Sequence, residues 1–163
     1  MKYHLLAGML LAATPALAQT APPAGQEAAA PFKKANTLVI HTSDSLATAY
    51  KKLAGVLLNA GYTIDRNDKE LGFLNTKARP TPNKTAMHTL RASVVKTQAG
   101  ADMLLRGSYA TPGLAAISPW LMAGDTETEY RGMRGSIVMS CWDELEKVAA
   151  LYPSGRLAYK AQL

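Results

Sequence analysis

Two segments of the chain carry apolar residues at helical spacing, and this pattern limits the possible folds more than any other feature. The first stripe consists of Leu46, Tyr50, Leu53 and Leu57, and the second of Trp142, Leu145, Val148, Ala149 and Tyr152. A helix with a single apolar stripe buries that stripe against one neighbouring layer. We therefore predict one helix that ends at Asn59-Ala60-Gly61 and a second that ends at Pro153-Ser154-Gly155.

Strand-like segments lie before the first helix and between the two helices. They are residues 37–42, 62–65, 71–78, 90–95 and 103–107, and polar or glycine-containing turns separate several of them. Residues 157–159 can add an edge strand. The predicted order is β-α-β-β-β-β-α: an α+β fold with an antiparallel sheet of four to six strands, both helices on one face and the other face partly open.

The first residues of the chain have the pattern of a secretory signal. Lys2 precedes an apolar run from Leu5 to Leu11, and the small residues of Ala16-Leu17-Ala18 favour cleavage after Ala18. We therefore predict a signal peptide over 1–18, a flexible Ala/Pro-rich tether over 19–35 and a single α+β domain over 36–163. The expected location is periplasmic or secreted. No stretch is long enough for a membrane-spanning helix, so an integral membrane protein is not expected.

Residues 57–72 contain a helix end, Gly61 followed by Tyr62, an extended segment, the acidic turn around Asp68, and Gly72. This arrangement resembles a module of the C-component lipoprotein of the outer-membrane β-barrel assembly machinery. The resemblance covers residues 37–76, and beyond them it extends only to the order of the elements. It implies a TATA-binding-protein-like β-α-β4-α fold in a cell envelope. The chain has one such module and lacks the lipobox cysteine, so the resemblance implies neither lipid attachment nor that machinery's contacts.

Residues suited to catalysis or metal binding are few. The chain has three histidines and one cysteine, without the spacing of a zinc site, and no loop with a phosphate-binding pattern. We therefore predict no catalytic residue, no metal and no cofactor. Cys141 has three possible roles: a core thiol, a thiol that meets His41 and His88 in space, or half of an intermolecular disulfide.

Residues 111–122 (TPGLAAISPWLM) form an apolar stretch that proline and glycine interrupt. Such a loop either covers the open sheet face or contacts a partner. In the second case we expect Trp120, Leu121 and Met122, with Arg131 and Arg134 nearby, to form an apolar and basic contact surface.

These patterns favour a non-enzymatic, exported envelope module that binds a protein or lipid through the open sheet face and this loop. The alternative is a small-ligand-binding protein or weak hydrolase, with His41, Tyr109 or Cys141 supplying polar groups between sheet and helices. The formal net charge of +6 becomes +5 once Lys2 leaves with the signal peptide, and this charge is spread along the chain. A nucleic-acid partner is therefore not expected.

Overall fold

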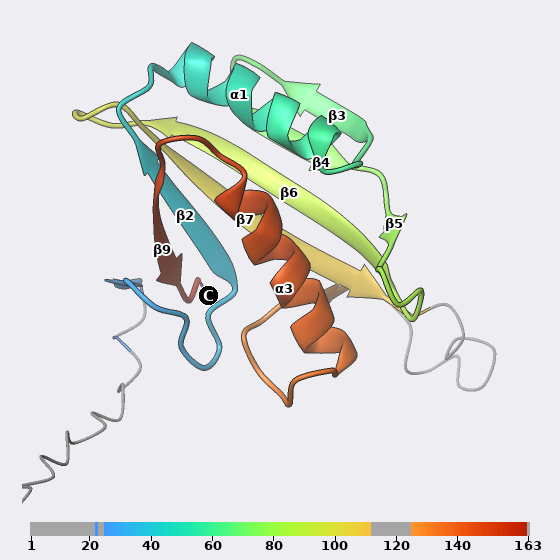
Figure 1. Cartoon of the computed structure of the whole chain (residues 1–163). Helices are drawn as coiled ribbons and strands as arrows, with labels where there is room; N and C mark the ends of the chain where they lie inside the picture. Colours follow the sequence, from blue (N-terminus) through green and yellow to red (C-terminus); the bar gives the residue numbers. More distant parts are fainter. Residues whose placement is uncertain (1–21, 23–24, 112–124, 163) are drawn as a thin grey trace, which may run out of the picture.

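The computed structural model describes residues 22, 25–111 and 125–162 (Figure 1). In chain order its elements are β1 (Glu27–Ala28), β2 (Thr37–Thr42), α1 (Leu46–Asn59), β3 (Ile64–Asp68), β4 (Phe73–Thr76), β5 (Arg79–Pro80), β6 (Met87–Lys96), β7 (Ala101–Ala110), β8 (Thr126–Glu127), α3 (Ile137–Ala150) and β9 (Arg156–Lys160).

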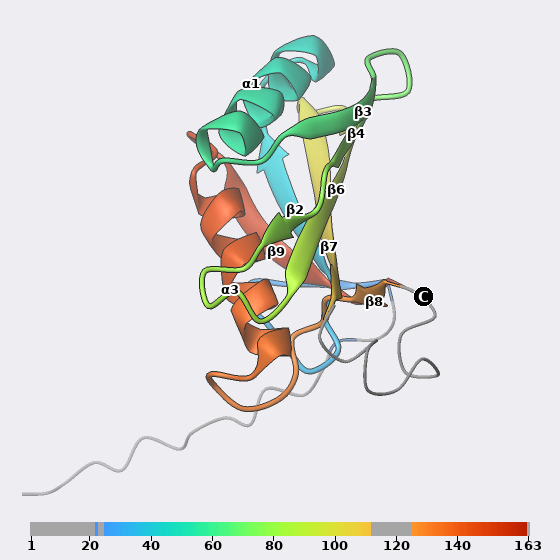
Figure 2. The same ribbon diagram turned by 90° about the vertical axis from the view of Figure 1, so that its right-hand side faces the viewer.

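The strands form one antiparallel sheet, and both helices pack on the same face of it. The strand order is β1-β9-β2-β7-β6-β4-β3, with β5 paired to β6 and β8 paired to β7. Figure 2 views the sheet close to edge-on, with α1 and α3 together on one side. The predicted α+β class, antiparallel sheet and single helix-bearing face are confirmed.

The strand count differs from the prediction, because the described residues contain nine strands where we expected four to six. Three of the nine, β1, β5 and β8, have two residues each. So short a pairing has no alternation that a sequence pattern could reveal. It forms because a connecting segment passes beside a strand that is already in place.

The C-terminal strand β9 follows the second helix as expected, but it is not at the edge of the sheet. It pairs with β2 on one side and with β1 on the other. The order of elements therefore departs from the prediction through the short strands β1, β5 and β8, whereas the C-terminal strand differs only in its position between β1 and β2.

The segment before β2 belongs to the folded domain, although we predicted a flexible tether up to residue 35. Glu27 and Ala28 pair with Lys160 and Tyr159 of β9. Phe32 is 7% exposed and Ala35 is fully buried in the main apolar cluster. An Ala/Pro-rich composition suggested a tether, but one aromatic side chain and a neighbouring strand are enough to order this segment.

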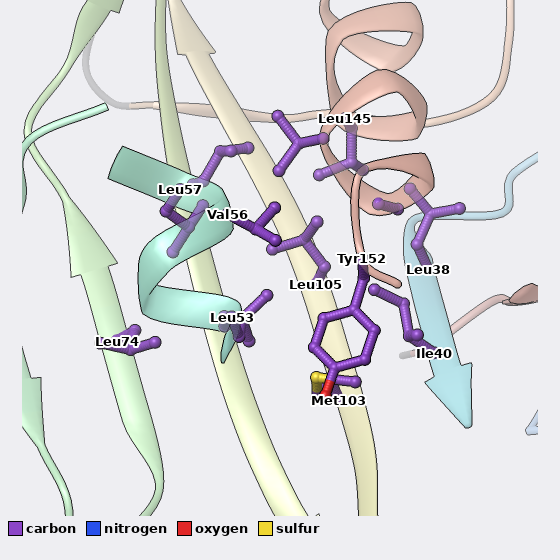
Figure 3. Close-up of a cluster of buried hydrophobic side chains, with 14 of the residues drawn as sticks. Leu38, Ile40, Leu53, Val56, Leu57, Leu74, Met103, Leu105, Leu145 and Tyr152 are labelled. Atoms are coloured by element: carbon purple, nitrogen blue, oxygen red, sulfur yellow. The ribbon is translucent and has the colours of Figure 1, made fainter. Parts of the chain in front are cut away.

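The core lies between the helices and the covered face of the sheet (Figure 3). Leucines of α1 meet Leu105 and Met103 of β7, while Leu145 of α3 approaches Leu38 of β2. The residues labelled in Figure 3 are Leu38, Ile40, Leu53, Val56, Leu57, Leu74, Met103, Leu105, Leu145 and Tyr152. Burial of this kind is the main favourable term in folding, at roughly 25 cal/mol per Å² of apolar surface.

Side-chain caps begin both helices. The Ser45 hydroxyl accepts a hydrogen bond from the Thr48 amide, and the Ser136 hydroxyl accepts one from the Met139 amide. α1 ends where predicted, since Gly61 has a φ of +82°, which favours glycine. No helix in the described parts of the chain is long and apolar enough to cross a membrane.

Candidate functional site

The predicted contact residues fall into two groups in the structure. Trp120, Leu121 and Met122 lie outside the described residues. Arg131 and Arg134 are exposed in the connection between β8 and α3, where the Nε atom of Arg131 lies 3.4 Å from a Glu129 carboxylate oxygen. This connection passes the end of the sheet towards the helix side (Figure 2). The two arginines therefore do not lie among the strands of the open face.

The open face of the sheet has a row of five residues, four of them apolar, that crosses five strands. Adjacent partners in the strand register run from β4 to β9 in the order Phe73, Ser93, Leu104, Val39 and Ala158. Val39 and Ala158 are each 2% exposed, while Phe73 and Leu104 are half-buried. Val95, further along β6, is 51% exposed. The β4–β6–β7 part of this face therefore presents apolar groups to solvent.

Two arginines lie directly opposite each other beside this row. Arg91 of β6 pairs in register with Arg106 of β7. The Nε atom of Arg106 donates to the Thr37 hydroxyl at 3.1 Å and lies 3.6 Å from a Glu127 oxygen. Arg91 is exposed and has no ion pair within the described parts of the chain. Glu127 offsets part of the repulsion that like charges at opposite strand positions cause, and the exposed Arg91 lies beside the held Arg106.

A shallow cavity of about 260 Å³ lies at the arginine pair. It is lined by Arg91, Arg106, Gly107, Ser108, Asp125 and Glu127. We use the name open-face patch for Phe73, Arg91, Ser93, Val95, Leu104 and Arg106. The patch combines apolar contact area with guanidinium donors, a combination that is enriched in the centres of protein interfaces.

The His41 side chain connects strand β2 to the edge strand β1 and to β7. Its Nδ1 atom lies 2.8 Å from Asp102 Oδ1, and its Nε2 atom lies 2.8 Å from Glu27 Oε2. The ring therefore lies between one carboxylate of β7 and one of β1. Its polar contacts link β1, β2 and β7, which indicates a structural role rather than a catalytic one.

The other residues of the predicted small-ligand site do not meet His41. Tyr109 is seven residues along β7 from Asp102, a separation of about 23 Å at roughly 3.3 Å per residue. Cys141 is fully buried on α3, and burial, with a smaller contribution from Glu144, raises the pKa of its thiol to about 11. Such a thiol is protonated near neutral pH and is a weak nucleophile.

His88 lies in a buried polar network on the helix side. Its Nδ1 atom is 3.2 Å from the Tyr62 hydroxyl, and its Nε2 atom is 3.4 Å from the Thr128 hydroxyl. Burial, with a smaller contribution from Arg79, lowers the pKa of His88 to about 4. The ring is therefore neutral at physiological pH, and it does not converge with His41 on Cys141.

A further polar site, which sequence reasoning missed, lies between the helices. Arg79 of β5 reaches Glu144 of α3, with 2.7 Å between Nη2 and Oε2. The sequence contains one indication of this site: Glu144 is a charged residue at helical spacing from Cys141 and Val148, on the apolar stripe. A carboxylate there needs a cationic partner. The partner is 65 residues away in the chain, so the sequence pattern does not indicate which cation it is.

Over the described residues no group of three histidine, cysteine or acidic side chains is arranged to hold a metal ion. No protein-family model matches this chain, and no curated protein sequence matches it either.

Proposed function

We propose that the protein is an exported, non-enzymatic binding module of a cell envelope, and that a protein or lipid partner docks on the open face of its sheet. The observation that supports this most strongly is the open-face patch. Both helices cover the opposite face (Figure 2). The half-buried Phe73 and Leu104 and the exposed Val95 therefore lie beside two arginines on the face that neither α1 nor α3 covers.

The chemistry of the patch indicates how a partner would be held. Its apolar side chains contribute burial, at roughly 25 cal/mol per Å² of apolar surface removed from water. Arg91 offers a guanidinium with five N–H donors, and it is free of carboxylate partners in the described structure. The favoured partner surface is therefore apolar with an acidic group at its border.

Two further arguments from the sequence belong to this proposal. The leader pattern over residues 1–18 supports export. The resemblance of residues 37–76 to an envelope lipoprotein module supports the same compartment. Residues 111–122 remain predicted to contribute to the partner surface through Trp120, Leu121 and Met122.

The test compares two double variants of the full chain. Arg91→Gln with Leu104→Ser changes the open-face patch, whereas Lys51→Gln with Leu58→Ser makes the matched change on the exposed surface of α1. We expect the first variant to lose at least about tenfold in capture of its partner, because apolar burial and charge-assisted hydrogen bonds are both removed. The control should bind like the parent protein.

Binding is measured with proteins from an envelope extract and with vesicles of phosphatidylethanolamine and phosphatidylglycerol. Loss of protein capture alone would identify a protein partner, and loss of vesicle binding alone would identify a lipid. Equal binding by the parent and both variants, all correctly folded, would show that the open face is not the docking surface.

A further inference from the structure

A second cavity lies on the helix side of the sheet, away from the open-face patch. The C-terminal end of α1, strand β5 and the second half of α3 line it. Figure 1 shows where these three elements lie in the fold. Its volume of about 550 Å³ is within the range of small-molecule sites. The cavity is therefore large enough for a ligand of its own, independent of any partner on the open face.

Arg79 is held in a fixed position in the wall of this cavity. It is paired with Glu144 at 2.7 Å, donates to the Ala60 carbonyl, and has its guanidinium carbon 4.2 Å from the centre of the Tyr62 ring. Its side chain is still 30% exposed. Because these contacts have already ordered the side chain, binding a ligand here loses little conformational entropy.

The charged groups of the cavity favour an anion. Its lining includes three cations, Arg79, Lys84 and Lys147, and one carboxylate, Glu144. Glu144 accepts from Arg79, while the Lys147 amine is 3.8 Å from its other oxygen and the Lys147 side chain is 72% exposed. The four charged side chains of the lining therefore have a net charge of +2.

Three carbonyl groups at the end of α1 already have hydrogen-bond donors. The carbonyls of Leu57, Leu58 and Ala60 already accept hydrogen bonds from Tyr62, Gly61 and Arg79 respectively. The donor groups in the lining that suit an anion belong to Arg79, Lys84 and Lys147.

The rest of the lining is apolar and partly rigid. Pro80 and Pro82 form part of it, and proline fixes its own backbone torsion. Val148 and Leu151 also line the cavity, and the Leu151 side chain is 51% exposed to solvent. These groups suit a short hydrocarbon segment attached to the anion.

From the fixed arginine, the excess positive charge and the apolar walls, we infer that this cavity binds a small oxyanion, the carboxylate or phosphate group of a molecule with a short apolar body. Arg79, Lys84 and Lys147 contact the oxyanion. Val148 and Leu151 contact the apolar body.

The experiment follows amide resonances of the ¹⁵N-labelled full chain as hexanoate or inorganic phosphate is added. We expect saturable shifts in residues around the cavity. Lys84→Gln with Lys147→Gln should weaken binding about tenfold, since charge-assisted hydrogen bonds are lost from an exposed position. Leu151→Glu should weaken it as well, because it adds a negative charge at the mouth.

The matched control, Lys51→Gln with Lys69→Gln, removes the same charge from exposed positions outside this cavity and should bind like the parent. Tighter binding of hexanoate identifies a carboxylate ligand with an apolar body, and tighter binding of phosphate identifies a phosphate-bearing one. The inference is wrong if sodium chloride at equal ionic strength causes the same shifts, or if both lysine pairs weaken binding equally. Neither result affects the open-face proposal.

Discussion

At the scale of single residues, the fold makes one histidine structural and another a source of pH sensitivity. His41 uses both ring nitrogens to hold carboxylates of two other strands. His88 is 1% exposed and packs so closely against β7 that a side-chain carbon added at Gly107 would lie 2.5 Å from its Nε2 atom. Glycine at this position leaves the space that the buried ring occupies.

The lowered pKa of His88 predicts a loss of stability in acid. Its pKa is about 4 in the folded protein against 6.5 for the free side chain, so between these values the unfolded chain binds the proton more readily. The free energy of unfolding therefore loses up to roughly 3 kcal/mol from His88 as the pH falls from about 6.5 towards 4. Urea unfolding of the parent and of His88→Gln at pH 7, 5.5 and 4 measures this contribution.

The glutamine variant keeps a polar group beside Tyr62 and Thr128 but cannot take up the proton, so its stability should fall less steeply with pH. His41→Gln is the comparison variant, because it makes the same substitution at a histidine on the open face of the sheet. An identical pH dependence in the parent and in His88→Gln would contradict a lowered pKa for His88.

At the scale of elements, a serine cap begins each helix, and the same face of the sheet buries both apolar stripes. Each begins at a serine whose hydroxyl accepts a backbone N–H bond, and each buries its apolar stripe on the same sheet face. The second helix begins at Ile137, upstream of Trp142, where the predicted stripe starts. Met139, three residues before Trp142, is buried and extends the stripe into the first turn, and the Ser136 cap marks where the helix begins.

Removal of either cap should destabilise the protein. We expect Ser45→Ala and Ser136→Ala each to lower the free energy of unfolding by about 1 kcal/mol, because a helix N–H group loses its partner. Ser43→Ala, at an exposed position just before the cap of α1, should change it by less than about 0.5 kcal/mol. Urea denaturation at pH 7 distinguishes these values, and equal effects at Ser43 and Ser45 would rule out the cap as the cause.

At the scale of the whole molecule, the segment before β2 completes both the sheet and the core. β1 extends the sheet beyond β9, and the Glu27 carboxylate reaches His41 on β2. Phe32 joins the same apolar cluster as Trp142 and Tyr159. The domain therefore depends on residues whose composition resembles that of a linker.

Phe32→Ala tests this dependence. The phenyl group is buried, so its loss should lower the free energy of unfolding by about 3 kcal/mol. Lys33→Ala, an exposed neighbour in the same segment, should have little effect. Thermal and urea unfolding provide the measurement, and an unchanged Phe32→Ala protein would mean that the segment is a tether after all.

The sequence by itself determined what depends on neighbours along the chain. The period of its apolar residues specified two helices and the principal strands, and one stripe per helix required both helices to share a sheet face. Glycine at 61 marked the end of α1 because a positive φ is easiest for glycine.

Only the tertiary structure decided which distant groups meet. Arg79 and Glu144 are paired across the cavity, His41 lies far from Tyr109, and Arg91 lies opposite Arg106. The two-residue strands also arise only when the sheet is assembled. Hydrogen bonds, ion pairs and strand register join residues far apart in the chain, and a local pattern carries no information about which partner the fold brings near.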